Sequence, residues 1–266
     1  MTAPPPSGPV SGGALLEARG VTRRFGGLTA VDDVHLAVAG GTVHGLIGPN
    51  GAGKTTLVNM LTGVERPDSG RVRLSGEDVT GVPSHRLAGL GLVRSFQTSQ
   101  LFDDEDVLTN VMAGRHRHVR YRFPHTWCYT RVTARSEREQ RARCLDLLDK
   151  LGLAGYARAQ VGALPYGRRR LVEIARALAT EPRLLVLDEP AAGLPGSDVD
   201  ILAALLKHLA ETEYTVLIIE HNMGLMMSVC DVMTALAQGR VIAEGTPSQV
   251  RKDPVVIEAY LGKAGT

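Results

Sequence analysis

Residues 164–194, LPYGRRRLVEIARALATEPRLLVLDEPAAGL, decide the fold class of this chain. The apolar run Leu184–Leu187 is typical of a buried strand, and it ends in the acidic pair Asp188 and Glu189. A glycine-centred turn and a helical pattern over 170–179 precede that strand. Phosphate-handling proteins use adjacent carboxylates at the end of a buried strand to hold Mg²⁺ and to activate water. The stretch therefore predicts one half of a phosphate site.

The other half lies far upstream, in the glycine-rich motif that starts at Gly48. It matches G-x-x-x-x-G-K-[ST] and lies between a predicted strand over 43–47 and a predicted helix over 55–61. Its glycines let backbone N–H groups converge on phosphate oxygens, and the helix N-terminus adds a favourable dipole. Lys54 would neutralise phosphate oxygens, and the Thr55 hydroxyl would ligate Mg²⁺. The residues predicted to bind the nucleotide here are Gly48, Pro49, Asn50, Gly51, Ala52, Gly53, Lys54, Thr55 and Thr56.

The two carboxylates have different predicted roles. We expect Asp188 to hold Mg²⁺ through a bound water and Glu189 to act as the general base toward the attacking water. The alternative for Glu189 is a loop cap paired with an arginine.

Composition narrows the class of protein. The chain has 266 residues, enough for one large α/β domain or for one domain with an inserted lobe. A formal net charge of +2 does not indicate a nucleic-acid partner. The three cysteines lack the spacing of a zinc site, which fits a reducing compartment. There is no apolar run of membrane-spanning length and no secretion signal, so we expect a partner to supply any membrane part.

Strand and helix signals alternate along the chain. The strands predicted over 184–187 and 215–219 each follow a helical pattern, which favours an α/β fold with a parallel sheet. Residues 1–13 are rich in Pro, Gly and Ser and are expected to be a disordered tail. A charged, helix-rich region in the middle of the chain indicates an inserted lobe, and 248–262 is predicted to be a closing helix.

Taken together, the motifs resemble the ATP-binding subunits of ABC transporters, from about Leu15 to Gly262. Within that family the chain is most similar to the ATPases of high-affinity branched-chain amino-acid importers, although relatives that move urea, amides or lipids share much of the pattern. The resemblance implies a P-loop (RecA-like) parallel-sheet core with an N-terminal antiparallel β region and an inserted α-helical lobe. The segments that carry it are RRFGGLTAVDDV, GPNGAGKTT, VRSFQ, LPYGxxRxxEIARAL, LDEPAAGL, LIIEHN and IAEGTP…VIEAYLG. The expected divisions are a tail over 1–13, then one ABC ATPase domain over 14–262, with its catalytic core at 14–90 and 171–247, its helical lobe at 91–170 and a C-terminal helix at 248–262.

The resemblance also implies roles for four other residues. Phe25 matches the aromatic that stacks on adenine, and Gln97 matches the glutamine that reaches Mg²⁺ and the water. His221 matches the histidine that contacts the γ-phosphate. Gly167 lies in the signature turn, which reaches across a head-to-tail dimer to the partner's ATP. The alternatives are a core aromatic, a surface amide and a strand-end histidine for the first three.

Departures from the family pattern fall on elements that face the partner. Pro165 replaces the usual signature serine, Arg168 and Arg169 stand where glutamines are common, and Pro195 replaces an acidic or amide residue. We therefore expect a heterodimer with a second ABC ATPase subunit whose signature is standard.

As a whole, the resemblance implies an ATPase subunit that energises an ABC importer of branched-chain amino acids or related amide or polar solutes. Its cofactors would be ATP and Mg²⁺. It would be a peripheral subunit at the cytoplasmic face of the cell membrane. Integral-membrane permease subunits would be partners, a solute-binding protein would act indirectly, and no nucleic acid is expected. Alternatives are an ABC ATPase for urea, amides or lipids, and a nucleotide-gated regulatory module with little turnover.

The sequence is compatible with more than one role for each of two charged segments. The acidic run over 103–106 could bind basic residues of a permease helix or form a solvated face. The basic and aromatic segment over 115–131 could pack on its own lobe, face lipid or permease, or bind nucleic acid.

Overall fold

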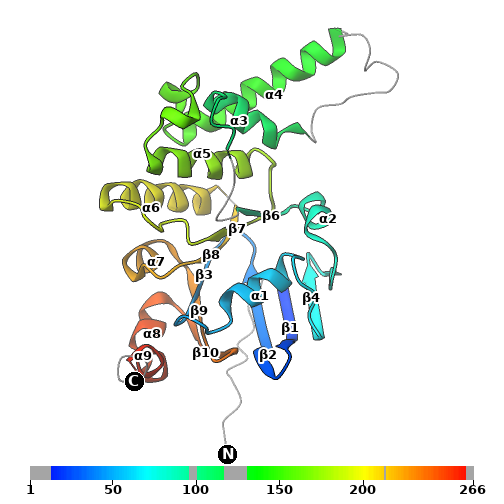
Figure 1. Ribbon diagram of the computed structural model, residues 1–266, viewed down its shortest axis with the longest axis vertical. Helices are drawn as coiled ribbons and strands as arrows, with labels where there is room; N and C mark the ends of the chain where they lie inside the picture. The colour runs from blue at the N-terminus through cyan, green and yellow to red at the C-terminus, as the bar shows by residue number, and fades with distance from the viewer. Residues whose placement is uncertain (1–12, 96–100, 117–130, 213, 262–266) are drawn as a thin grey trace, which may run out of the picture. The chain divides into compact units, whose positions relative to one another are not determined.

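The computed structural model describes residues 13–95, 101–116, 131–212 and 214–261 (Figure 1). The predicted tail, apart from its last residue, lies outside this part of the chain, and so does most of the basic and aromatic segment. The described residues form two compact units. The first holds the chain up to Ser84, residues 210–217 and everything from Cys230 onward, and the second holds 85–209 and 218–229.

An antiparallel sheet forms the start of the first unit, with strand order β2-β1-β4-β5. Apolar side chains alternate with polar ones along β1, so that Leu16 and Ala18 are buried while Glu17 and Arg19 lie on the other face. This region matches the predicted N-terminal antiparallel β region. Its strands are β1 (Ala14–Phe25), β2 (Leu28–Ala39), β4 (Ser69–Leu74) and β5 (Glu77–Asp78).

The first unit also contains a second, mainly parallel group of strands. β3 (Val43–Ile47) is buried along its whole length, as a central parallel strand should be, and it pairs in parallel with β9 (Val232–Ala237). β10 (Arg240–Gly245) pairs antiparallel with β9. β8 (Thr215–Ile219) lies beside β3; it starts in the first unit and ends in the second. α1 (Lys54–Leu61) follows β3, which confirms the strand and the helix expected around the glycine motif.

The second unit joins a short parallel strand pair to several helices. β6 (Leu92–Ser95) pairs in parallel with β7 (Leu184–Asp188), the predicted acidic strand. α5 (Tyr166–Leu178) buries Leu171, Ile174 and Leu178, whose spacing places them on one helical face. The other helices here are α2 (Ser84–Gly89), α3 (Val107–Gly114), α4 (Arg131–Lys150), α6 (Gly196–Glu211) and α7 (Met223–Val229), with 3₁₀ turns at Ala154–Tyr156 and Val161–Ala163.

The C-terminal segment is two helices, α8 (Pro247–Lys252) and α9 (Pro254–Leu261), where the sequence predicted one over 248–262. Proline disfavours helical backbone in the residue before it, and Asp253 is accordingly extended at φ −66° and ψ 122°. The proline ring therefore ends α8 and starts α9.

The strands and helices confirm the mixed α/β class. Among the residues that the structure describes, no helix is both long enough and apolar enough to cross a bilayer.

Candidate functional site

The glycine-rich loop after β3 is a tight turn in the first unit. Gly48 has φ 151°, and a Cβ there would lie 2.1 Å from the carbonyl oxygen of Leu236. Gly53 has φ 99°, and its Cβ would lie 2.3 Å from the carbonyl oxygen of Ala30. Only glycine fits both positions, so the loop presents bare backbone.

Lys54 folds back over this loop at the start of α1. Its Nζ atom donates hydrogen bonds to the carbonyl oxygens of Gly48 (2.7 Å) and Pro49 (3.0 Å), and its side chain is buried. Gly53, the residue before α1, is left-handed and offers no side chain to cap the helix. A helix N-terminus without a side-chain cap attracts anions, and a lysine above it adds a positive charge. Thr55 follows with an exposed side chain and Thr56 with a half-buried one.

Two contacts from distant parts of the chain hold the loop in place, and the sequence did not reveal either of them. The Gly239 N–H donates to the carbonyl oxygen of Ala52 (2.9 Å), from the turn between β9 and β10. The Gly48 N–H donates to the hydroxyl oxygen of Tyr260 in α9 (2.9 Å). A Gln-Gly pair between two strands could have predicted the turn, but nothing local indicates what it contacts.

Phe25 lies at the tip of the β1–β2 hairpin, opposite Leu28, and 44% of its surface is exposed. The guanidinium carbon of Arg23 lies 4.8 Å from the centre of its ring. Its exposure rules out the alternative of a core aromatic, and the ring already stacks with one planar group.

The acidic pair at the end of β7 belongs to the second unit. Asp188 accepts a hydrogen bond from Arg94 of β6 (2.5 Å), and both side chains are about nine-tenths buried. Glu189 has a left-handed backbone (φ 46°), which ends the extended conformation of the strand directly after Asp188. Its Oε1 atom lies 3.0 Å from Nε2 of His221, so the structure brings together two residues predicted to be catalytic.

Arg170 braces the backbone that carries these carboxylates. From α5, its guanidinium donates to the carbonyl oxygens of Asp188 (3.1 Å), Glu189 (3.2 Å) and Pro190 (3.3 Å). It also pairs with Glu173 at 2.6 Å, and burial raises the pKa of that carboxyl. Arg170 was not among the predicted site residues, although it lies four residues before the buried Ile174 and thus on the buried face of the helix.

Glu220, the residue before His221, is a second brace that the sequence analysis missed. It is buried, and its carboxylate accepts hydrogen bonds from the backbone N–H groups of Ala191 (2.6 Å), His221 (2.8 Å) and Asn222 (3.1 Å). One carboxylate therefore ties the loop after β7 to the loop after β8.

Gly167 is buried at the start of α5, next to Asp198 of α6. A Cβ at Gly167 would lie only 1.9 Å from Oδ2 of Asp198. A side chain here would have to displace that of Asp198, so a contact within the chain already favours glycine at this position. Pro165 precedes the helix without a side-chain cap.

The acidic run also makes contacts within the chain. Asp103 pairs with Arg169 (2.5 Å), and Asp106 caps α3 by accepting from the N–H of Thr109 (2.6 Å). Gln97, predicted to reach Mg²⁺ and the water, lies outside the described residues.

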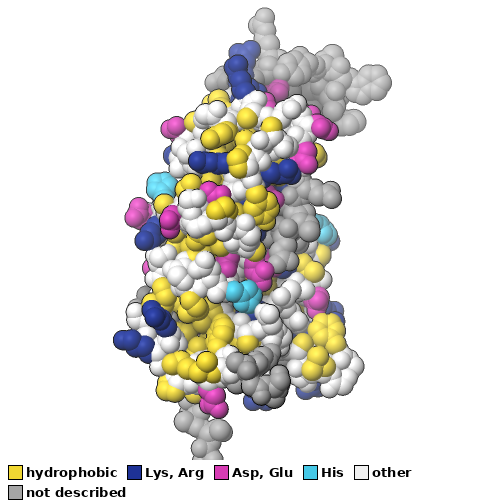
Figure 2. All heavy atoms as spheres, turned by 60° about the vertical axis from the view of Figure 1, so that its left-hand side comes forward, with side chains coloured by type: hydrophobic (Ala, Val, Ile, Leu, Met, Phe, Trp, Pro, Cys, Tyr) yellow, Lys and Arg dark blue, Asp and Glu magenta, His cyan; other side chains and the backbone are white. Residues whose placement is uncertain are grey.

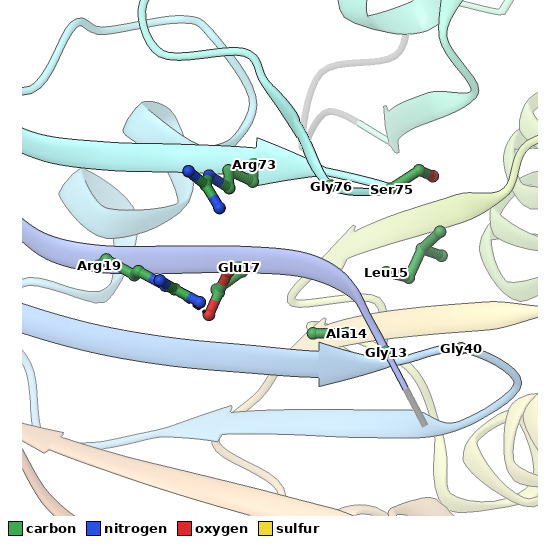
Figure 3. A pocket seen from close by; sticks show the side chains of 9 residues that line it. All are labelled: Gly13, Ala14, Leu15, Glu17, Arg19, Gly40, Arg73, Ser75 and Gly76. Atoms are coloured by element: carbon green, nitrogen blue, oxygen red, sulfur yellow. Dashed lines mark hydrogen bonds and ion pairs between the residues drawn. The ribbon is translucent and has the colours of Figure 1, made fainter. Parts of the chain in front are cut away.

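A hollow of about 620 Å³ lies against the antiparallel sheet (Figure 3). Figure 3 shows Glu17 and Arg19 on β1, which form an ion pair at 2.6 Å, and Arg73 on the adjacent strand. None of the residues predicted to bind a nucleotide lines this hollow. Within the described ranges, no cluster of three or more His, Cys, Asp or Glu side chains could hold a metal ion by itself.

Comparison with known proteins gives consistent matches. The family model described as ABC transporter matches residues 31–192, and the one described as branched-chain amino acid ATP-binding cassette transporter matches 240–266. The chain is 45% identical to the high-affinity branched-chain amino acid transport ATP-binding protein BraF of Pseudomonas aeruginosa, and 39% identical to LivG of Escherichia coli. Each of these alignments covers 94% of this chain and 98% of the relative.

A solved structure, the ADP conformation of MJ1267, an ATP-binding cassette of an ABC transporter, is similar with a TM-score of 0.81 and 32% identity. The match covers 94% of this chain and 99% of that one. The phosphate-loop geometry, the paired Glu189 and His221, and these matches lead to one conclusion: the chain belongs to the ABC transporter family, as an ATP-binding cassette, the ATPase that energises transport.

Proposed function

We propose that this chain is the ATP-hydrolysing subunit of an importer for branched-chain amino acids. The proposal is supported by BraF and LivG, which this chain matches along nearly their whole length and which are described as high-affinity branched-chain amino acid transport ATP-binding proteins. The C-terminal segment also matches a family model described as a branched-chain amino acid ATP-binding cassette transporter. Urea, amides and lipids remain alternative solutes. We keep the domain division proposed from the sequence, with a core at 14–90 and 171–247 and a helical lobe at 91–170.

The loop from Gly48 to Thr56 binds the nucleotide phosphates in this proposal. Its backbone is bare because of the glycines at 48 and 53, and Lys54 is already held above it by two loop carbonyls. Phosphate oxygens would compete with those carbonyls for the same ammonium group. Phe25 presents an exposed ring for the adenine, and Gly167 serves the nucleotide of a partner subunit.

Mg²⁺ fits the residue types available. The hydroxyl of Thr55 and the carboxylate of Asp188 are hard oxygen donors, and Gln97 would add an amide oxygen. When bound, the ion would neutralise charge on the phosphate oxygens.

Glu189 takes the proton of the attacking water, and its contact with His221 is the observation that carries the proposal. The imidazole at 3.0 Å fixes the direction of the carboxylate, while Arg170 and Glu220 fix the backbone on either side. The contribution of these residues is positioning and proton transfer.

The test is Glu189→Gln, which keeps the shape of the side chain and removes its basicity. Steady-state phosphate release is expected to fall by about 10²- to 10⁴-fold while ATP binding is retained. Glu77→Gln is the matched control, because Glu77 is an exposed carboxylate of the β4–β5 turn region and is expected to leave turnover unchanged. Hydrolysis at the wild-type rate by Glu189→Gln would remove Glu189 from this role.

The ATP-binding subunits of ABC importers work with membrane permease subunits, and we propose the same arrangement for this chain at the cytoplasmic face of the cell membrane. Co-expression with candidate permeases, reconstitution in vesicles and uptake of labelled leucine, urea or an amide would identify the solute. Leucine uptake that depends on this subunit is the expected result, and uptake of urea alone would redirect the assignment.

We also propose a second ABC ATPase subunit as partner, because Pro165 supplies no hydroxyl donor at the signature turn. The purified chain alone is expected to turn over slowly and without cooperativity. Full cooperative, transport-coupled turnover by a homodimer contradicts the heterodimer.

A further inference from the structure

We infer that Tyr260 of α9 is a positioning residue for the phosphate loop, an inference that rests on the proposed role of that loop in nucleotide binding. The hydroxyl oxygen of Tyr260 accepts a hydrogen bond from the N–H of Gly48, the first residue of the loop, at 2.9 Å. The two residues are 212 positions apart in the sequence.

Gly48 depends on this acceptor because of where β3 ends. The ladder between β3 and β9 ends with Ile47 opposite Ala235, so Gly48 has left the regular pairing. Gly48 is buried, and the carbonyl of Leu236 lies against its Cα on the side where a Cβ would stand. A buried N–H that loses its acceptor keeps its full desolvation cost, so the peptide plane of Gly48 is expected to follow the phenol.

The phenol belongs to the short helix α9, which buries only one large side chain, that of Val256, among its described residues. Tyr260 lies one turn further along the same face. Val255, Ile257 and Leu261 are exposed, with Leu261 at 66%. Figure 2 shows hydrophobic side chains reaching the surface in its lower part. Tyr260 is itself 38% exposed, but its hydroxyl reaches inward to accept the partly buried hydrogen bond from Gly48. Partial burial raises the pKa of Tyr260, while the bond from Gly48 opposes that rise.

Because the contact lies at the phosphate loop, we expect it to affect nucleotide binding and not the hydrolysis step. The loop is proposed to hold phosphates that ATP and ADP share, so a displaced Gly48 should weaken both nucleotides alike. Such uniform binding changes KM and leaves kcat unchanged. The C-terminal segment, residues 240–266, is matched by its own family model, so this contact ties a subgroup-specific helix to the loop that the whole family is proposed to share.

The experiment compares full-length wild type with Tyr260→Phe, which removes the acceptor and keeps the ring. We expect affinity for ATP and ADP to fall by about fivefold to tenfold, KM for ATP to rise equally, and kcat to stay within about twofold. In protein labelled with ¹⁵N-glycine, the Gly48 amide should be protected from hydrogen exchange in wild type and lose that protection in the variant. Tyr156→Phe is the matched control, since Tyr156 is a partly exposed tyrosine of the second unit.

Three results would overturn the inference. One is a Gly48 amide that exchanges freely in the wild-type protein, a measurement that does not depend on how the variant folds. Another is unchanged nucleotide affinity in Tyr260→Phe. The third is a lower melting temperature with unchanged KM, which would make Tyr260 a purely structural residue. Failure of the wild type to bind ATP would instead overturn the proposed function, and the exchange of Gly48 would still report on the contact.

Discussion

His44, the second residue of β3, makes the stability of this protein depend on pH. It is 1% exposed, and burial lowers its pKa from 6.5 to about 4. Its Nε2 atom lies 2.8 Å from Oγ1 of Thr234, whose hydroxyl in turn donates to Glu244. Because the hydroxyl proton goes to Glu244, Nε2 of His44 must be the donor to Thr234, and the neutral imidazole carries its proton there.

The sign and size of the effect follow from these pKa values. The unfolded chain, with a pKa of 6.5 at this histidine, binds a proton at a higher pH than the folded chain does. Stability from this group is therefore complete above pH 6.5 and is lost as the pH falls toward 4. Between pH 7 and pH 5 the loss amounts to about 2 kcal/mol of unfolding free energy, and below pH 4 to about 3 kcal/mol.

The assay measures urea unfolding at both pH values for wild type and His44→Gln, a neutral side chain of similar reach. The difference between the two proteins isolates His44 from the other histidines, and the variant is expected to lose about 2 kcal/mol less on acidification. Histidine ¹³C chemical shifts should show one ring in the wild type that stays neutral at pH 5. Identical pH dependence in both proteins, or a ring at position 44 that titrates near 6.5, would refute the reasoning.

Three further predictions concern the two halves of the site. Arg170→Met should lower the unfolding free energy by about 3 kcal/mol in thermal unfolding, because it leaves the partly buried carboxylate of Glu173 and three backbone carbonyls without their donor; a loss below about 1 kcal/mol would contradict the bracing role. Gly167→Ala should be destabilising, and Asp198→Ala should relieve part of that cost in a double-mutant cycle, whereas strict additivity would argue against their contact. Gly53→Ala should weaken ATP binding about tenfold or more by calorimetry, since its Cβ overlaps the carbonyl of Ala30; unchanged affinity would show that the loop can relax.

Local patterns were enough to predict the strands and helices that carry the sequence motifs, but not the others. The run before Asp188 and the run over 43–47 are both strands that are buried at every position, as central parallel strands are, and mainly apolar residues in each made them predictable. The prediction of one closing helix was wrong. It followed the helical pattern after residue 247 and did not take into account that Pro254 interrupts a helix.

The supports of the site could not be predicted, because they act between residues far apart in the chain. No spacing rule connects Tyr260 with Gly48, or Glu220 with Ala191. Motifs indicate which side chains carry the chemistry, since that chemistry fixes residue types. The partners that hold those side chains are set by tertiary packing, which accepts many residue types.

The hydrogen bonds of the Arg170 guanidinium suggest a way to inhibit the proposed ATP hydrolysis. It fastens the first turns of α5 to three successive carbonyls, including that of the residue proposed as the catalytic base. Because these hydrogen bonds join the two segments, a shift or rotation of α5 would have to stretch them or move the backbone of Glu189. A small molecule wedged against the start of α5 would thus disturb water activation from a distance, and could inhibit the enzyme without competing with ATP for its own loop.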